Sequence, residues 1–233
     1  MQKLTEPTPR VQYFTVTRIT LAAIIFLVGF TGFLSIYNAT RDGGSLAQFD
    51  HPTHDWLAAN RTPVLDTAML TVTDLMSPIG LIVLVLVGCG IWAWRKREYW
   101  RPLLLIGAAG IAFIVTTLIK HVAGRVRPPT ADMIPPFELD FSFPSGHTIV
   151  VAVCLFVLGY LTWSRRRTVR IFTRWAFITL FGVVLIAFSR LYLGYHWLTD
   201  VSASVCLALI VLAFVIVVDP LLSAKEAALG NGR

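Results

Sequence analysis

The chain of 233 residues is 56% apolar and only 14% charged, and its mean hydropathy is +0.70. This composition excludes an ordinary soluble domain. The formal net charge of +7 could suit nucleic acid, but the basic residues lie in short segments between apolar stretches, and no basic soluble domain exists to carry that function. The composition therefore indicates an integral membrane protein without a nucleic-acid partner.

Six stretches are apolar and long enough to cross, as helices, a hydrocarbon core about 30 Å thick. We place them near residues 17–37, 72–94, 102–121, 148–163, 175–193 and 198–218. We therefore expect one all-α domain over residues 1–233, a polytopic bundle of six transmembrane helices. The three cysteines, Cys89, Cys154 and Cys206, lie inside these stretches, where they are expected to pack as small apolar residues, and this argues against a disulfide framework or a zinc site.

Two of the connections between these stretches are strongly basic. They contain Arg95, Lys96, Arg97 and Arg101 between the second and third stretches, and Arg165, Arg166, Arg167, Arg170 and Arg174 between the fourth and fifth. The positive-inside rule makes these connections cytoplasmic, together with both termini. Residues 38–71, residues 122–147 and the turn at Gly194 are then expected on the outer side of a plasma (inner) membrane.

The first outer connection contains DHPTHD, residues 50–55. Two histidines three residues apart beside carboxylates could hold a metal ion, but Pro52 between them weakens the helical geometry that would aim both at one ion. We therefore expect a solvated loop without a metal, in a segment that lies at the membrane interface.

Charged residues in or beside membrane spans are costly and usually functional. The first such cluster contains Lys120 and Arg127, followed by Pro128 and Pro129. On a helix, a spacing of seven residues returns to nearly the same face, so these two cations could bind one anion. The prolines are expected to end that helix.

The second cluster is PSGH, residues 144–147, directly before the fourth stretch. Ser145 lies where an N-cap is expected, and the amides of a helix N-terminus form an anion site with the positive end of the helix dipole. Gly146 permits close approach of the backbone, and His147 can gain or lose a proton near neutral pH.

The third cluster contains Arg190, His196 and Asp200. If the last span begins near His196, Asp200 lies four residues on and on the same face, so its carboxylate can hold the proton of one ring nitrogen. The other nitrogen is then free to act as a nucleophile or a base.

Each of these groups alone could be structural: Ser145 a helix cap, Lys120 and Arg127 interfacial anchors, His196 and Asp200 an interfacial pair. Together they place cations on the outer boundary, where the positive-inside rule disfavours them. Three cations around helix-end amides suit a phosphate group, which needs charge stabilisation rather than a redox cofactor. Attack by His196 on phosphorus and protonation of the leaving alkoxide by His147 would complete a hydrolase without a metal.

Three blocks carry a family resemblance: K-x6-R-P at residues 120–128, P-S-G-H at 144–147, and S-R-x5-H-x3-D at 189–200. In this order they resemble the type 2 phosphatidic acid phosphatase (PAP2) superfamily, in its six-helix branch of membrane lipid phosphatases. The resemblance implies that His196 forms a transient phosphohistidine, that Asp200 orients it and that His147 is the general acid. It implies phosphate binding by Lys120, Arg127, Ser145, Gly146 and Arg190, with no cofactor. His121, which matches no motif position, is expected to point elsewhere.

We therefore predict an integral membrane lipid phosphatase that acts at the outer leaflet. Its substrate could be a polyprenyl diphosphate, phosphatidylglycerophosphate or phosphatidic acid, since all three present the same reacting group. Three alternatives remain. A phosphotransferase would pass the phosphate to another hydroxyl group, a vanadium haloperoxidase of the same superfamily would hold vanadate, and a non-catalytic membrane protein would only bind an anion.

Overall fold

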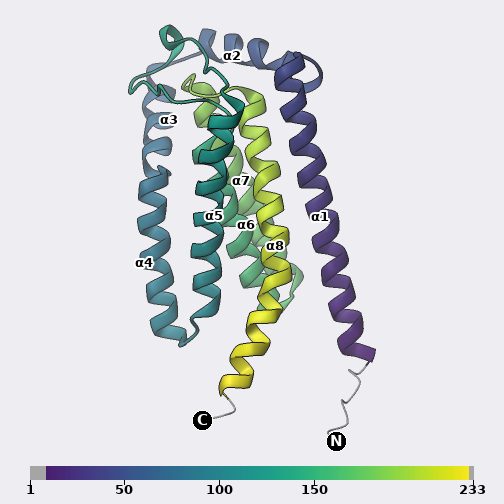
Figure 1. The fold of residues 1–233 in the computed structure, drawn as a ribbon. Helices are drawn as coiled ribbons and strands as arrows, with labels where there is room; N and C mark the ends of the chain where they lie inside the picture. The colour runs from purple at the N-terminus through teal and green to yellow at the C-terminus, as the bar shows by residue number, and fades with distance from the viewer. Residues whose placement is uncertain (1–8, 231–233) are drawn as a thin grey trace, which may run out of the picture.

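The computed structural model describes residues 9–230, and within them it contains only helices and connections. Figure 1 shows a bundle of long, roughly parallel helices with shorter helices across one end. The long helices are α1 (Pro9–Asp42), α4 (Pro78–Lys96), α5 (Trp100–Ala123), α6 (Gly146–Arg166), α7 (Val169–Tyr192) and α8 (Leu198–Gly230). The shorter ones are η1 (Ser45–Phe49), α2 (Asp50–Ala59), α3 (Pro63–Leu75) and η2 (Thr130–Asp132).

The six long helices are each long and apolar enough to cross a membrane, which confirms the predicted all-α, six-span bundle. Helix α6, with 21 residues, is about 30 Å long at 1.5 Å per residue and so matches the hydrocarbon core. The expected spans lie within these helices, apart from residue 193, which follows α7, and the second span, which is predicted at 72–94. There, residues 72–75 belong to α3, and α4 begins at Pro78, because Ser77 caps it and Pro78 occupies its first turn.

Helix α6 forms the centre of the bundle and contacts α4, α5, α7 and α8. Its residues Ile149, Val153, Val157 and Leu161 are fully buried, one turn apart along one side of the helix. By contrast, α4 and α7 expose large apolar side chains, as expected of helices whose outer faces meet lipid tails. The bundle therefore has its packed core around α6, directly below PSGH.

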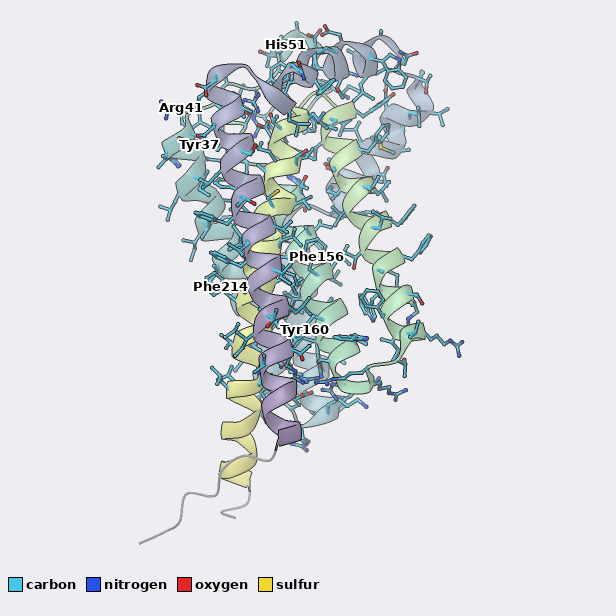
Figure 2. The ribbon with its side chains drawn as sticks, turned by 90° about the vertical axis from the view of Figure 1, so that its right-hand side faces the viewer. Tyr37, Arg41, His51, Phe156, Tyr160 and Phe214 are labelled. Atoms are coloured by element: carbon cyan, nitrogen blue, oxygen red, sulfur yellow. The ribbon has the colours of Figure 1, made fainter. Side chains whose placement is uncertain are left out.

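Helix α1 packs along α8, so the first and the last helix of the chain lie side by side (Figure 2). At Gly29 the two backbones approach so closely that an added Cβ would lie 2.7 Å from the carbonyl oxygen of Cys206. Small residues permit such contact between membrane helices, where van der Waals packing replaces the hydrophobic effect. Phe26 also meets Phe214 edge to face, with ring centroids 5.9 Å apart.

The first outer connection is helical rather than a solvated loop. The DHPTHD stretch begins α2, which lies across the end of the bundle (Figure 1), and both Asp50 and His54 are buried. Pro52 is tolerated because it lies in the first turn, where its missing N–H has no helical partner. The expectation of a solvated loop is therefore wrong, whereas the position at one end of the bundle agrees with an interfacial segment.

The basic connections α4–α5 and α6–α7 lie at the opposite end of the bundle from α2. Helix α1 begins, and α8 ends, at this same basic end (Figure 1). The two chain termini themselves, expected to be cytoplasmic, lie outside the described residues.

Candidate active site

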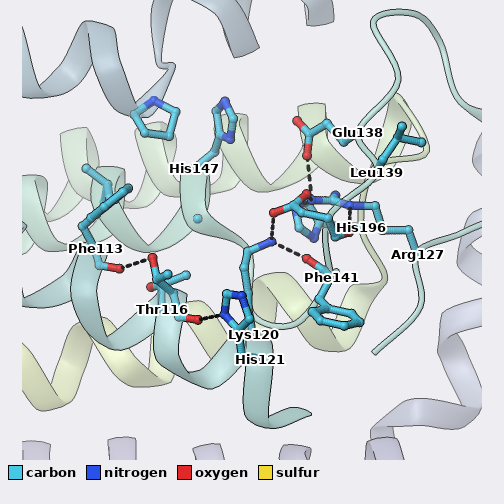
Figure 3. A pocket seen from close by; sticks show the side chains of 15 residues that line it. Phe113, Thr116, Lys120, His121, Arg127, Glu138, Leu139, Phe141, His147 and His196 are labelled. Carbon is cyan, nitrogen blue, oxygen red and sulfur yellow. Dashed lines mark hydrogen bonds and ion pairs between the residues drawn. The ribbon is translucent and has the colours of Figure 1, made fainter. Parts of the chain in front are cut away.

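A pocket of about 580 Å³ lies at the end of the bundle that carries α2. It is bounded by α4, α5, the connection between α5 and α6, the start of α6 and the segment before α8 (Figure 3). Its polar and charged lining is Thr116, Thr117, Lys120, His121, Arg127, Glu138, Asp140, His147 and His196, and its remaining lining is Pro78, Phe113, Leu139, Phe141, Gly146 and Val150. The three sequence blocks, far apart in the chain, therefore meet at one pocket.

Five of the eight expected site residues line this pocket: Lys120, Arg127, Gly146, His147 and His196. The other three, Ser145, Arg190 and Asp200, have no exposed surface and lie behind the lining. Asp200 bonds to His196 and Arg190 to Glu138, both of which line the pocket, whereas Ser145 bonds within the helix cap.

The imidazole of His196 is held at both ring nitrogens. Its Nδ1 lies 3.3 Å from Oδ2 of Asp200, and its Nε2 lies 3.3 Å from Nη1 of Arg127. A guanidinium can only donate, so Nε2 accepts and the ring proton belongs on Nδ1, where the Asp200 carboxylate accepts it. The expected pairing with Asp200 is present, but Nε2 is not free as predicted, because its lone pair accepts from Arg127.

His196 precedes α8 rather than lying in it, since the helix begins at Leu198. Asp200 reaches back and also accepts from the amide of Trp197 at 2.9 Å. Burial lowers the pKa of His196 well below its usual value, and the nearby charges of Arg127 and Arg190 lower it further. The ring is therefore neutral at physiological pH, which is the form that can act as a nucleophile.

PSGH forms the start of α6. Ser145 is the N-cap, and its hydroxyl accepts from the amide of Thr148 at 3.4 Å and from the Thr148 hydroxyl at 3.0 Å. Its side chain is thus used within the cap, while Gly146 and His147 face the pocket. The ring of His147 makes no hydrogen bond to any of the described residues, so it is available to a bound molecule.

The three expected phosphate-binding cations are paired with two carboxylates of the α5–α6 connection. Lys120 donates to Asp140 at 2.8 Å, and Arg127 pairs with Glu138 at 2.8 Å and with Asp140. Arg190 donates to Glu138. Burial would raise the pKa of Asp140, but hydrogen bonds and charge from Lys120 and Arg127 outweigh it and lower that pKa below the usual value.

Lys120 and Arg127 do not lie on one face of a helix, contrary to the prediction. Helix α5 ends at Ala123 with Gly124 in the left-handed conformation, so Arg127 lies beyond the helix and not on its face. Arg127 reaches the pocket instead through bonds to the carbonyl oxygens of Asp140, at 2.8 Å, and Tyr195, at 2.5 Å.

Sequence reasoning missed Glu138, Asp140 and His121. The carboxylates carry no motif, although an acidic pair directly before PSGH was a possible signal. His121 lines the pocket, contrary to the expectation that it points elsewhere. Its Nδ1 lies 2.7 Å from the carbonyl oxygen of Thr117, and its ring meets Phe141 at 6.1 Å.

The histidines of α2 contribute to packing. His51 and His54 flank Trp197, with ring centroids 4.7 Å and 5.5 Å from it, and His54 Nε2 lies 3.3 Å from Oδ2 of Asp132. Among the residues that the structure describes, no three His, Cys, Asp or Glu side chains form a group that could hold a metal ion.

Two named proteins of Bacillus subtilis are similar to this chain in sequence. Phosphatidylglycerophosphatase B of Bacillus subtilis is 33% identical over 153 residues, which cover 64% of this chain and 73% of that protein. Undecaprenyl-diphosphatase BcrC of Bacillus subtilis is 28% identical over 158 residues, which cover 66% of this chain and 74% of that protein.

Solved structures share the fold. The crystal structure of a transmembrane PAP2-type phosphatidylglycerolphosphate phosphatase from Bacillus subtilis superposes with a TM-score of 0.72 at 25% identity, covering 82% of this chain and 93% of that chain. The fold of Aquifex aeolicus LpxE matches with a TM-score of 0.53 at 22% identity, over 72% of this chain and 94% of that chain. The model of the PAP2 superfamily matches residues 101–222, the segment that contains all three blocks. This chain therefore belongs to the PAP2 superfamily, as a membrane protein with six spanning helices.

Proposed function

We propose that the protein is a membrane lipid phosphatase that hydrolyses a lipid phosphomonoester or diphosphate through a phosphohistidine on His196. One observation carries this proposal: His196 lines a pocket of cations, with Nδ1 on Asp200 and Nε2 accepting from Arg127. That arrangement leaves a neutral nucleophile whose tautomer is set by a buried carboxylate.

In the first step Nε2 attacks phosphorus, an N–P bond forms, and the bond from phosphorus to the leaving oxygen breaks. His147, which enters this step in its protonated form, gives its proton to that oxygen and becomes neutral, while the proton on Nδ1 of His196 stays in the hydrogen bond to Asp200. In the second step His147 takes a proton from water, the water oxygen attacks phosphorus and the N–P bond breaks. Inorganic phosphate leaves, and both histidines return to their initial states.

The substrate phosphate would take the place now occupied by Glu138 and Asp140. Their carboxylates present oxygen atoms to Lys120, Arg127 and Arg190, as a phosphate would. The start of α6 adds backbone amides next to the same pocket. Charge stabilisation by these groups supports a reaction that needs no metal ion.

The apolar wall of the pocket suits a lipid. Pro78 of α4, Phe113 of α5 and Val150 of α6 continue from the cations towards the middle of the bundle. A headgroup could bind at the boundary while its tail lies between the helices. Because the pocket lies at the end opposite the basic connections, we place the reaction at the outer leaflet of the plasma membrane. The named relatives act on phosphatidylglycerophosphate and undecaprenyl diphosphate, so these two lipids and phosphatidic acid are the candidate substrates.

The test is phosphate release by purified protein in EDTA from each of these three lipids. We expect release by the wild type and none by His196→Ala. His51→Ala, the same change at an exposed histidine outside the pocket, is expected to retain activity. Turnover by His196→Ala would overturn the assignment of the nucleophile, and loss of activity in EDTA would overturn the metal-free mechanism. Phosphate transfer only when a second hydroxyl compound is added would indicate a phosphotransferase, and binding without turnover a non-catalytic anion-binding protein.

A further inference from the structure

A chain of polar groups continues behind Asp200, in which Asp50 and Thr199 are buried and Arg125 is partly exposed. While Oδ2 of Asp200 faces His196 and the amide of Trp197, Oδ1 accepts from Nη1 of Arg125 at 2.5 Å. Asp200 has no exposed surface, so its negative charge needs a partner. Arg125 supplies that partner from within the K-x6-R-P block, at a position that is not one of the motif residues.

Arg125 is held in turn by Asp50, the first residue of α2. Nη2 of Arg125 donates to Oδ2 of Asp50 at 2.6 Å, and Asp50 is only 2% exposed. Asp50 also accepts from the amide of Thr199 at 2.9 Å and from its hydroxyl at 2.7 Å. The Thr199 hydroxyl accepts from Nη1 of Arg125 at 2.6 Å, and the guanidinium lies 5.7 Å from the ring of Trp197.

One guanidinium thus lies between two buried carboxylates, one of which orients His196. We propose that Arg125 and Asp50 are positioning residues for the reaction. Arg125 keeps Asp200 ionised with Oδ2 on the His196 ring. Asp50 neutralises part of the positive charge of Arg125. The negative charge of Asp200 is then less compensated by Arg125 and can stabilise the positive charge that develops on the His196 ring during attack. This inference rests on the proposed function, because it takes His196 as the nucleophile.

The chemistry of the contacts favours this role over a simple tie between α2 and α8. Thr199 already joins α8 to Asp50 of α2 through its amide and its hydroxyl, yet the Arg125 fork is in addition shared between Asp50 and the catalytic carboxylate. Neither Arg125 nor Asp50 lines the pocket, so neither touches the substrate. Changes to them should therefore alter the rate of attack and leave phosphate binding unchanged.

The test compares Asp50→Asn and Arg125→Lys with wild type in the purified full-length protein, with phosphatidic acid in mixed micelles as the probe substrate. We expect kcat and the rate of phosphohistidine formation, measured by rapid alkaline quench with labelled phosphate, to fall together by about tenfold or more. The KM and the inhibition constant of inorganic phosphate should stay within about twofold of wild type. Asp55→Asn, the same change at an exposed position of α2, is the matched control and should behave as wild type.

Wild-type kcat in either variant would overturn the inference. The inference would also be overturned if the loss of activity were fully explained by a lower melting temperature or by a weaker affinity for inorganic phosphate. A purely structural link between α2 and α8 predicts that result. Thr199→Val removes the hydroxyl without changing charge or size, and it is expected to lower kcat by a smaller factor. This variant keeps the test valid if a charge change prevents folding. His196→Ala is measured alongside: turnover by it defeats the proposed function, whereas an inactive His196→Ala with fully active Asp50→Asn defeats only this inference.

Discussion

The protonation state of His196 follows from its surroundings at the scale of single residues. The ring is 2% exposed, and the cations Arg127, Arg190 and Lys120 act on it in addition to burial. Each of these effects disfavours a positive charge on the His196 ring. Asp200 favours a positive charge on the ring through its contact with Nδ1, but Arg125 compensates part of the negative charge of Asp200. The site is thus built to hold a neutral imidazole among positive charges, which suits attack on an anionic phosphate.

This environment predicts how stability depends on pH. The unfolded chain binds a proton on His196 near pH 6.5, but the folded chain does not, because its pKa is well below that value. The contribution of His196 to the free energy of unfolding is therefore complete above pH 6.5. It is lost as pH falls below 6.5, by up to about 1.4 kcal/mol per pH unit. Melting temperatures of wild type and His196→Asn at pH 7.5 and 5.5 test this. We expect the smaller decrease in His196→Asn, and equal decreases would contradict the prediction.

The residues of the proposed site and the pairing of His196 with Asp200 could be predicted from sequence, but the acidic partners of the cations could not. Lys120, Arg127, His147 and His196 occupy motif positions, and the structure brings them to one pocket. Glu138 pairs with Arg127 and with Arg190, which lies 52 positions further along the chain. Ion pairs of this kind depend on how distant segments meet in the fold, and no local spacing encodes them.

At the scale of helices and turns, the connection between α7 and α8 sets the place of His196. Gly194 has a φ of +76°, and the amides of Tyr195 and His196 both donate to the carbonyl oxygen of Arg190. An added Cβ at Gly194 would lie 2.7 Å from the carbonyl oxygen of Asp132 and 3.0 Å from Nη2 of Arg61. The turn is therefore packed against the α5–α6 connection, and it leaves no room for a side chain.

Gly194→Ala should therefore lower both stability and activity. We expect a loss of about 1–3 kcal/mol in the free energy of unfolding, from left-handed strain together with the clash. Gly43→Ala is the matched control, since Gly43 has a φ of +69° but open space around its missing Cβ. It should cost about 1 kcal/mol or less, from strain alone, and leave activity unchanged. Equal losses in denaturant unfolding of the two variants would show that the clash at Gly194 is absent.

Hydropathy predicted the spanning helices well because insertion into lipid depends on composition over about 20 residues. Hydropathy did not predict the helix boundaries and packing that depend on individual side chains. The break between α3 and α4 comes from the cap by Ser77 and from Pro78, which an average over a window does not detect. Likewise α2 forms a packed helix because Asp50 and His54 find partners on α8 and in the α5–α6 connection. Such partners become visible only when the chain is folded.

At the scale of the whole molecule, charge and chemistry are separated along the bundle axis. Basic residues of the α4–α5 and α6–α7 connections form one end, where Arg101 also donates to the carbonyl oxygen of Leu161 and pairs with Asp219 at 3.5 Å. The pocket lies near the other end, between α4, α5, the start of α6 and the segment before α8. That end is the one that carries α2 (Figure 1). If this end faces the outer side, as we propose, a headgroup in the outer leaflet would meet it directly, whereas one in the inner leaflet would first have to cross the bilayer.

The orientation of the bundle can be tested in intact cells with a membrane-impermeant maleimide. Asp55→Cys places a thiol on an exposed position of α2, and Val169→Cys places one at the start of α7, where Val169 is 77% exposed at the basic end. The positive-inside rule predicts that the basic end is cytoplasmic. We therefore expect labelling of Asp55→Cys from outside and of Val169→Cys only after the cells are opened. The wild type, whose three cysteines lie in membrane spans, is the unlabelled control. Labelling of Val169→Cys in intact cells would place the pocket on the cytoplasmic side, and its substrate would then come from the inner leaflet.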